Sequence, residues 1–162
     1  MTYFRRMRKA FFLLFVAATA CSRQADPVPV PPAPTHTVGW RVDGQDVMTD
    51  HYVSLSALPG STLVVYGRDY ANGSEVQLEM PGAVGTYTFG AGSPAWATYA
   101  TRAGTKYAAG AAPGASGATG PGTVVLTALA NGVAVGTFAF TGIDPVTKAV
   151  KSVTTGTFRV PI

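Results

Sequence analysis

The sequence has little charge, a single cysteine, and no apolar run of membrane-spanning length after its N-terminal segment. Charged residues make up 12% of the 162 positions and hydrophobic residues 47%, which excludes a disordered acidic or basic chain. One cysteine excludes an internal disulfide bond and a zinc site built from several cysteines. The 19 glycines follow no three-residue period, so the chain is not collagen-like.

Positive charge is concentrated at the N-terminus. Arg5, Arg6, Arg8 and Lys9 account for the net charge of +4. After Cys21, eight lysines and arginines balance eight aspartates and glutamates. The rest of the chain is therefore neutral, and its basic pI does not indicate nucleic acid as a partner.

Residues 1–20 have the pattern of an export signal. A basic start is followed by a short apolar stretch and then by small residues, a run too short for a membrane span. Ala18-Thr-Ala-Cys21 resembles the bacterial lipobox, which implies cleavage before Cys21, diacylglyceryl transfer to its sulfur and acylation of the new amine. The alternative is an ordinary secretory signal with an incidental cysteine.

The lipobox resemblance sets the expected location and the first partner. A chain acylated at Cys21 is held by the membrane through its lipid, since more than one acyl chain gives stable anchoring. Ser22 stands where the inner-membrane retention signal of enteric bacteria has aspartate, so we expect a cell-envelope protein of the outer membrane. Whether it faces the periplasm or the cell surface stays open.

Residues 21–36 form a proline-rich linker after the expected lipidation site. Five prolines fall between Pro27 and Pro34, and proline favours extended polyproline II structure because it fixes φ and lacks a backbone donor. We interpret the segment as a spacer between the lipid and the domain that follows. The alternative is a proline-rich ligand for another domain.

Residues 37–162 are predicted to form one all-β domain. Short runs with a period of two alternate with turn residues, and Asp43-Gly44 and Asn131-Gly132 are two-residue hairpin signals. About nine or ten short strands predict a single antiparallel β-sandwich or an incomplete β-barrel. The expected strands are residues 38–42, 45–48, 52–58, 62–68, 75–80, 86–89, 95–101, 123–130, 133–141 and 152–160.

The same alternation predicts the core, and composition predicts one flexible loop. Phe138 and Phe140 lie two residues apart and share a strand face. Residues 108–122 are all Gly, Ala, Pro, Ser or Thr, a composition that supplies little core and predicts a flexible loop. The other expected core residues are Val76, Leu78, Met80, Val124, Leu126, Val153 and Phe158.

Several short Gly- and Thr-containing stretches carry a family resemblance. They are residues 62–67, 76–82, 85–89, 122–126, 136–140 and 155–158. Through them the chain resembles an uncharacterised family of small β-rich lipoproteins of Bacteroidota, a domain of unknown function, over roughly residues 37–160. The resemblance implies a β-rich cell-envelope domain, and it brings no activity and no catalytic residue.

The sequence offers no convincing catalytic, cofactor or metal site. Gly114-Ala-Ser-Gly117 lacks the spacing of a serine nucleophile elbow. His51 falls near Asp43, Asp46 and Asp50, but this spacing is not that of a calcium-binding loop. We interpret these residues as a solvated cluster beside a turn; a weak metal or ligand contact is the alternative.

Carboxylates and aromatic residues give two further candidates. Glu75 and Glu79 would share a strand face about 13 Å apart, beyond the spacing of glycosidase carboxylates, so we expect them to keep that face soluble. Five aromatic residues could form a sugar-stacking or apolar-ligand surface, although period-two aromatics are more often core. They are Trp40, Trp96, Tyr66, Tyr70 and Tyr99.

These observations favour a non-catalytic binding or structural module of the cell envelope, with an envelope polymer or a protein as its partner. The alternative is a small carrier that holds an apolar ligand inside a partly closed β-barrel. An enzyme is the least favoured class, because no catalytic constellation is present in the sequence.

Overall fold

The computed structural model describes residues 36–57, 62–115, 117 and 119–162. The regular elements in these ranges are strands, so the predicted all-β class is confirmed. The expected signal segment, Cys21 and residues 22–35 of the linker lie outside the described residues. No helix in the described ranges is long and apolar enough to cross a membrane. The strands are β1 (Thr37–Val42), β2 (Gln45–Thr49), β3 (Tyr52–Ala57), β4 (Thr62–Arg68), β5 (Glu75–Pro81), β6 (Gly85–Phe89), β7 (Trp96–Ala100), β8 (Lys106–Gly110), β9 (Gly122–Ala130), β10 (Val133–Ile143) and β11 (Val150–Pro161).

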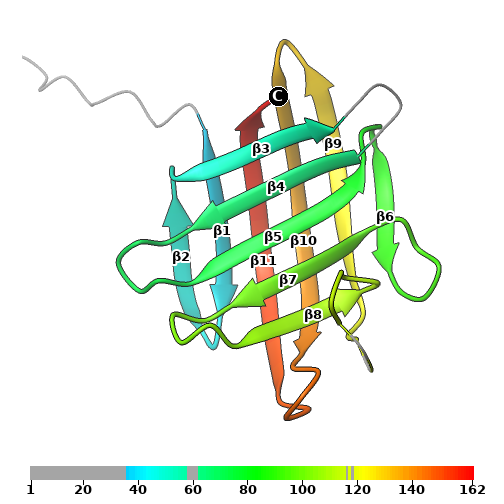
Figure 1. Ribbon diagram of the computed structural model, residues 1–162. Coiled ribbons are helices and arrows are strands. Elements are labelled where there is room, and N and C mark those ends of the chain that lie inside the picture. The colour runs from blue at the N-terminus through cyan, green and yellow to red at the C-terminus, as the bar shows by residue number, and fades with distance from the viewer. Residues whose placement is uncertain (1–35, 58–61, 116, 118) are drawn as a thin grey trace, which may run out of the picture. The chain divides into compact units, whose positions relative to one another are not determined.

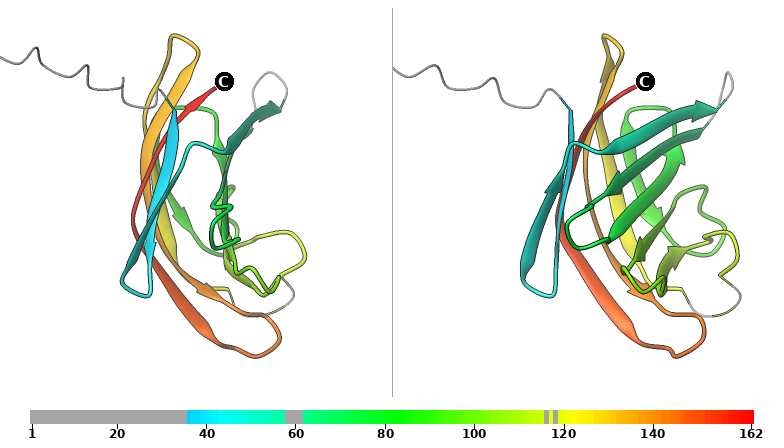
Figure 2. Two further views of the ribbon diagram at one scale, coloured as in Figure 1. Left: turned by 90° about the vertical axis from the view of Figure 1, so that its left-hand side faces the viewer. Right: turned by 60° about the vertical axis from the view of Figure 1, so that its left-hand side comes forward.

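The strands form one antiparallel sheet that folds over itself into two layers. The back layer has the order β2-β1-β11-β10-β9-β6, and the front layer has the order β3-β4-β5-β7-β8. Figure 1 shows the front strands running across the back strands, and Figure 2 shows the two layers facing each other. Pairing of Ile143 in β10 with Ala108 in β8 joins the layers. The result is a nearly closed barrel, which agrees with the predicted sandwich or incomplete barrel.

A buried threonine holds the second junction between the layers, at the corner between β2 and β3. Thr49 Oγ1 donates a hydrogen bond to the carbonyl oxygen of Arg68 at 2.7 Å and accepts one from the backbone N–H of His51 at 2.9 Å. The N–H of Arg68 donates to the carbonyl oxygen of His51 at 3.0 Å. The corner is therefore tied to the end of β4.

Both predicted two-residue hairpins are confirmed. Asp43 and Gly44 have φ values of 51° and 79°, and Asn131 and Gly132 have 54° and 72°. Two consecutive residues with positive φ make the type I′ turn, whose twist matches that of the flanking strands. These turns set the registers of β1 with β2 and of β9 with β10.

The core lies between the layers and is built from alternate residues of each strand. Val76, Leu78 and Met80 of β5 have no exposed surface, and Phe138 and Phe140 of β10 are each 3% exposed. The predicted core residues Val124, Leu126, Val153 and Phe158 are also buried. Period-two burial on both layers leaves the alternate side chains of each strand facing outward.

Two Gly-Thr-Phe tripeptides face each other at the centre of the back layer. In the antiparallel register Phe138 lies opposite Gly156, and Gly136 lies opposite Phe158. A Cβ on Gly156 would lie 2.5 Å from the Phe138 ring, and a Cβ on Gly136 would lie 2.3 Å from the Phe158 ring. Each glycine therefore leaves the space that the opposite phenylalanine ring fills. The two rings stack with centroids 6.5 Å apart.

A β-bulge in β11 brings Val153 and Phe158 to the same core-facing side of the strand. Val153 and Phe158 are five residues apart, so a regular strand would turn them to opposite faces. The register of β10 with β11 shifts between Phe138 and Phe140, and Thr155 there has a φ of 47°. This extra residue brings Val153, Gly156 and Phe158 to the same buried face.

The predicted flexible loop over residues 108–122 is wrong at both ends. Ala108 and Ala109 belong to β8 and are buried, and Gly122 begins β9. Gly120 bonds to the backbone of Ala108 and Gly110 at 3.0 and 3.1 Å. A Cβ on Gly120 would overlap the carbonyl oxygen of Thr141, so only glycine lets the backbone of residue 120 approach β10 this closely. Composition alone did not reveal this contact.

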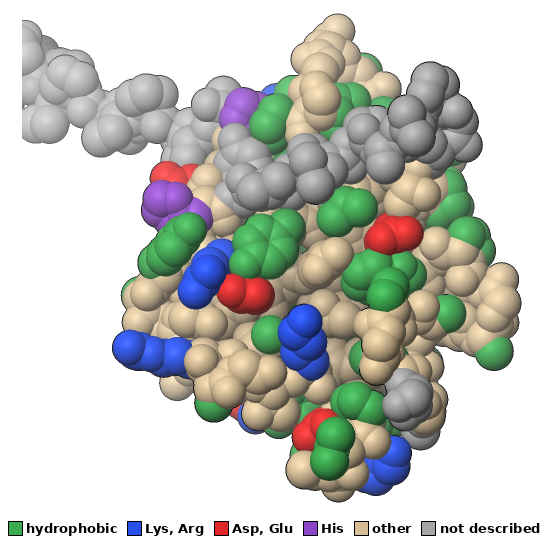
Figure 3. Space-filling model, in the orientation of Figure 1, with side chains coloured by type: hydrophobic (Ala, Val, Ile, Leu, Met, Phe, Trp, Pro, Cys, Tyr) green, Lys and Arg blue, Asp and Glu red, His purple; other side chains and the backbone are tan. Residues whose placement is uncertain are grey.

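The outer face of the front layer is mixed in character. Figure 3 shows side chains of both charge signs beside hydrophobic ones on this face. Arg68 of β4 pairs with Glu75 of β5 at 3.3 Å, and the register places Glu79 farther along the same strand. The front layer therefore presents a solvated face of the kind expected of a soluble sheet surface.

We predict that Gly156→Ala destabilises the domain, because the new methyl group would overlap the Phe138 ring. Overpacking of this kind typically costs about 1–3 kcal/mol in the free energy of unfolding, measured by denaturant titration. Gly90→Ala is the control, since a Cβ there has no heavy atom within 4 Å and its φ is not positive. Equal stabilities of the two variants would contradict the described Phe138–Gly156 contact.

Candidate functional site

The outer face of the back layer carries an array of threonine side chains. Residues that alternate with the buried core positions point away from the core, and on β6, β9, β10 and β11 threonine is the most frequent residue among them. We call this surface the threonine face. Its members are Thr86, Thr88, Thr123, Thr137, Thr141, Thr154, Thr155 and Thr157.

Strand register places these threonines in rows across the sheet. Thr137 pairs directly with Thr157 on β11 and with Val125 on β9, and Val125 pairs with Thr86 on β6. In a second row, Thr88 pairs with Thr123. Neighbouring strands lie about 4.7–4.9 Å apart, so the hydroxyl and methyl groups repeat at short, regular intervals.

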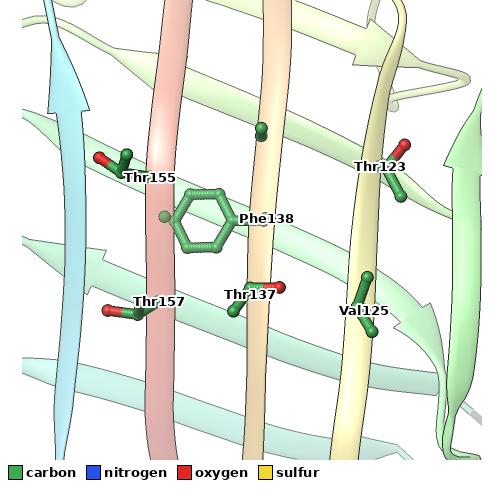
Figure 4. A pocket seen from close by; sticks show the side chains of 8 residues that line it. Thr123, Val125, Thr137, Phe138, Thr155 and Thr157 are labelled. Atoms are coloured by element: carbon green, nitrogen blue, oxygen red, sulfur yellow. The ribbon is translucent and has the colours of Figure 1, made fainter.

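Two adjoining hollows mark this face. One, of about 410 Å³, is lined mainly by Thr123, Val125, Thr137, Thr155 and Thr157. Figure 4 shows these side chains around the Phe138 ring, between β9, β10 and β11. The floor is low because Ala139 and Gly156, which also line the hollow, have little or no side chain.

The second hollow, of about 470 Å³, continues the first toward β6. The two share Thr123 and Ala139, and the second adds Thr88, Thr141 and Thr154. None of the residues that line either hollow is ionisable. A third, smaller hollow of about 180 Å³ shares Thr155 and Thr157 and reaches β1 and β2.

The threonine face offers hydrogen-bonding groups and small apolar groups side by side. Each threonine hydroxyl both donates and accepts a hydrogen bond, and each methyl group offers a small apolar contact. The residues that line its two larger hollows include no acid, base or thiol. General acid–base catalysis needs a positioned titratable group, so this arrangement favours binding over a chemical step.

A tyrosine with a displaced pKa lies on the outer face of the front layer. Burial, together with a hydrogen bond to Glu75 and the negative charge of Glu75, raises the pKa of Tyr66 to about 12. Arg68 lies over the Tyr70 ring at 5.1 Å, and the His51 ring meets Tyr70 edge-on at 4.8 Å. Tyr70 therefore packs against both Arg68 and His51 just after the end of β4.

The predicted cluster around His51 is dispersed in the structure. Asp46 pairs with Arg41 at 2.9 Å, Asp43 pairs with Lys151, and His51 lies 3.6 Å from Asp50. These carboxylates belong to different parts of the chain, because Asp43 is in the β1–β2 turn, Asp46 is in β2 and Asp50 follows β2. Across the described ranges, no group of three or more His, Cys, Asp or Glu side chains is placed to hold a metal ion.

The five candidate aromatic residues do not form one surface. Trp40 and Tyr99 are buried between the layers, while Trp96 packs in a separate cluster with Ala108 and Ala112. Tyr66 is half-buried and Tyr70 is exposed, both at the end of β4. The aromatic sugar-stacking hypothesis is therefore wrong for this set, and the core interpretation holds for most of it.

Sequence reasoning did not single out the threonine face. Its signal is threonine at alternate positions of four strands, visible in Thr86-Tyr-Thr88 and Thr155-Gly-Thr157. Each strand alone is ordinary, because threonine favours β structure and often faces solvent. The array becomes apparent once the register aligns the strands.

Comparison with known proteins identifies the family. Residues 52–161, more than half of the chain, match the family described as "Domain of unknown function (DUF6252)". The chain belongs to this family, and the matched range covers β3 to β11. No curated protein and no solved structure gave a significant match.

We predict that Tyr66 titrates well above the ordinary tyrosine pKa of 10.0. Its folded pKa of about 12 exceeds the ordinary value of 10.0, so its stabilising contribution is complete below pH 10.0 and is lost as the pH rises through about 12. Glu75→Gln should lower the pKa of Tyr66 by removing a charge and an acceptor, and Glu79→Gln should leave it unchanged. Tyrosinate absorbance, assigned with Tyr66→Phe, measures both; an unshifted Tyr66 in Glu75→Gln would contradict the described contact.

Proposed function

We propose that this chain is a lipid-anchored, non-catalytic binding protein of the cell envelope, and that its threonine face binds an uncharged, hydroxyl-rich polymer such as a neutral glycan. The observation that carries the proposal is the group of aligned threonines on β6, β9, β10 and β11, which borders two hollows whose lining residues include no ionisable group. A surface of this kind exchanges hydrogen bonds with hydroxyl groups.

The lack of charge argues for a neutral ligand. Nucleic acids and acidic polymers are bound through lysine and arginine, and the residues that line the two larger hollows include neither. Protein partners are usually held by tryptophan, tyrosine and arginine anchors in the centre of the interface. The only aromatic rings lining these hollows are Phe89 and Phe140 in one and Phe138 in the other, and all three are buried core residues. A polymer with many hydroxyl groups therefore fits better than a protein.

The membrane anchor of the proposal rests on the sequence around Cys21. The single cysteine of the chain occupies the position that a lipobox requires, and a proline-rich linker follows it. Lipidation at Cys21 would tether the binding domain to the outer membrane and keep it near the polymers of the envelope. A tethered domain gains effective concentration, so individually weak hydrogen bonds suffice for retention.

The carrier alternative gains no support from the interior. An apolar ligand would need space between the layers, where Trp40, Phe138, Phe140 and Phe158 are packed with 3% exposure or less. The larger hollows that the described residues line open instead on the outer face. We therefore place the ligand outside the barrel.

Binding to an insoluble neutral glycan tests the proposed ligand class. Microcrystalline cellulose and chitin are suitable probes, and depletion of the protein from solution gives the affinity. We expect the double variant Thr137→Glu/Thr157→Glu to bind at least about tenfold more weakly. A bound ligand would bury two adjacent carboxylates, and these charges would lose their solvation by water. Gln77→Glu on the front layer is the control and should bind like the wild type. A double variant that binds like the control would contradict the assignment of this face.

Lipidation is predicted to depend on Cys21. In detergent phase separation the wild-type protein should enter the detergent phase, and mass spectrometry should find acyl mass on its N-terminal peptide. Cys21→Ala should remain in the aqueous phase or accumulate as precursor, whereas Ser22→Ala should behave like the wild type. Wild-type protein in the aqueous phase without acyl mass would contradict the anchor.

A further inference from the structure

A polar pocket lies at one end of the barrel, away from the threonine face. Three connections that are distant in the sequence meet there: the β1–β2 turn with Asp43 and Gln45, the β4–β5 loop with Asn72 and Ser74, and the β7–β8 turn with Arg102. The pocket has a volume of about 210 Å³, and Val42, Val47 and Tyr99 supply its apolar surface.

Ser74 is the first sign that this pocket binds a ligand. Its side-chain oxygen is buried and has no hydrogen-bond partner in bonding geometry among the described residues, although Tyr99 lies beside it. The residue is only 4% exposed and lines the pocket. A buried polar atom without a partner costs stability, so such atoms are usually satisfied by something.

Arg102 is the second sign. Its aliphatic stem packs over Gly73, where a Cβ would lie 2.8 Å from Arg102 Cγ. Gly73 also has a φ of 72°, so two independent constraints favour glycine beneath the arginine. The exposed guanidinium lines the pocket and makes no ion pair or side-chain hydrogen bond with the described residues. It is a positioned cation without a counter-charge.

The remaining charges in the pocket are already neutralised. Asp43 pairs with Lys151, which reaches it from β11. A ligand would therefore meet one available positive charge, together with the Ser74 hydroxyl, the amides of Gln45 and Asn72, and an apolar wall. A small hydroxylated carboxylic acid has a carboxylate for the positive charge, hydroxyl groups for the Ser74 hydroxyl and the amides, and carbon atoms for the apolar wall.

We propose that this end pocket binds a sugar acid, a single ring that carries a carboxylate and several hydroxyl groups. Arg102 would hold the carboxylate through its paired N–H groups. Ser74, Asn72 and Gln45 would bind the hydroxyl groups, and Val42, Val47 and Tyr99 would contact the ring. The pocket volume of about 210 Å³ suits one sugar ring and not an oligomer.

A carboxylate fits the pocket better than a phosphate. A phosphate monoester carries about −1.5 to −2 charges at neutral pH, which is more than the single guanidinium of Arg102 balances. Tyr99 is protonated at neutral pH like any tyrosine, and burial raises its pKa further above the ordinary value of 10.0, with Lys151 and the neighbouring Ser74 hydroxyl opposing the rise. The site is independent of the threonine face, because the two lie on different parts of the barrel.

Titration calorimetry of the full-length chain in detergent tests the proposal with three probes. Sodium glucuronate should bind with a millimolar Kd, and methyl glucoside should bind at least about tenfold more weakly. The affinity for glucose 6-phosphate should be no higher than the affinity for glucuronate. Arg102→Gln should reduce glucuronate affinity to that of methyl glucoside, while Lys106→Gln, on the neighbouring strand β8, should have no effect. Equal binding of glucuronate by wild type and Arg102→Gln, or no saturable binding of glucuronate at all, would overturn the proposal.

Ser74→Ala separates a binding role from a structural one. Because Ser74 Oγ has no partner in the free protein, its removal should raise Tm, and because the ligand supplies the partner, its removal should also weaken glucuronate binding. Backbone amide shifts on titration should cluster at residues 42–47, 72–74 and 101–102. A lower Tm with unchanged affinity, or shifts confined to the threonine face, would contradict the assigned site.

Discussion

The reciprocal pairing of glycine with phenylalanine across β10 and β11 is the constraint on which the rest of the fold depends. Gly136 opposite Phe158 and Phe138 opposite Gly156 fix one register for the two longest strands, because a slip would place ring against ring. β10 also pairs with β9 and β8, and β11 pairs with β1. One pair of strands therefore connects both halves of the back layer to each other and to the front layer.

This inward arrangement determines the outward surface. Once the phenylalanine rings occupy the core, period-two geometry sends Thr137 and Thr157 outward as direct neighbours. The bulge at Thr155 adds a threonine while keeping Val153 and Phe158 buried. Packing inside and hydroxyl spacing outside are consequences of the same register, so the threonine face is as well defined as the core beneath it.

The sequence predicted the features that depend on local chemistry. Alternation identified the buried faces of β5 and β10, and Asp43-Gly44 and Asn131-Gly132 identified two hairpins from turn chemistry alone. The sequence did not predict β8, because its Ala and Gly residues show no alternating hydrophobic pattern and pack through close approach of the backbone. The threonine rows and the end pocket could not be read from the sequence, because each joins strands or turns whose alignment is set by tertiary pairing. Cys21 lies outside the described residues, so its role stays a prediction.

The central claim is that the threonine face, with its two hollows lined by uncharged residues, is the ligand-contacting surface of a tethered domain. NMR of selectively labelled threonine methyl groups, with a soluble neutral oligosaccharide as titrant, tests it most directly. The account predicts that the methyl signals of Thr123, Thr137, Thr155 and Thr157 shift together, while that of Thr98, on front-layer strand β7, stays unchanged. Shifts at Thr98 without shifts at these four residues, or no shift at any of them, would contradict it.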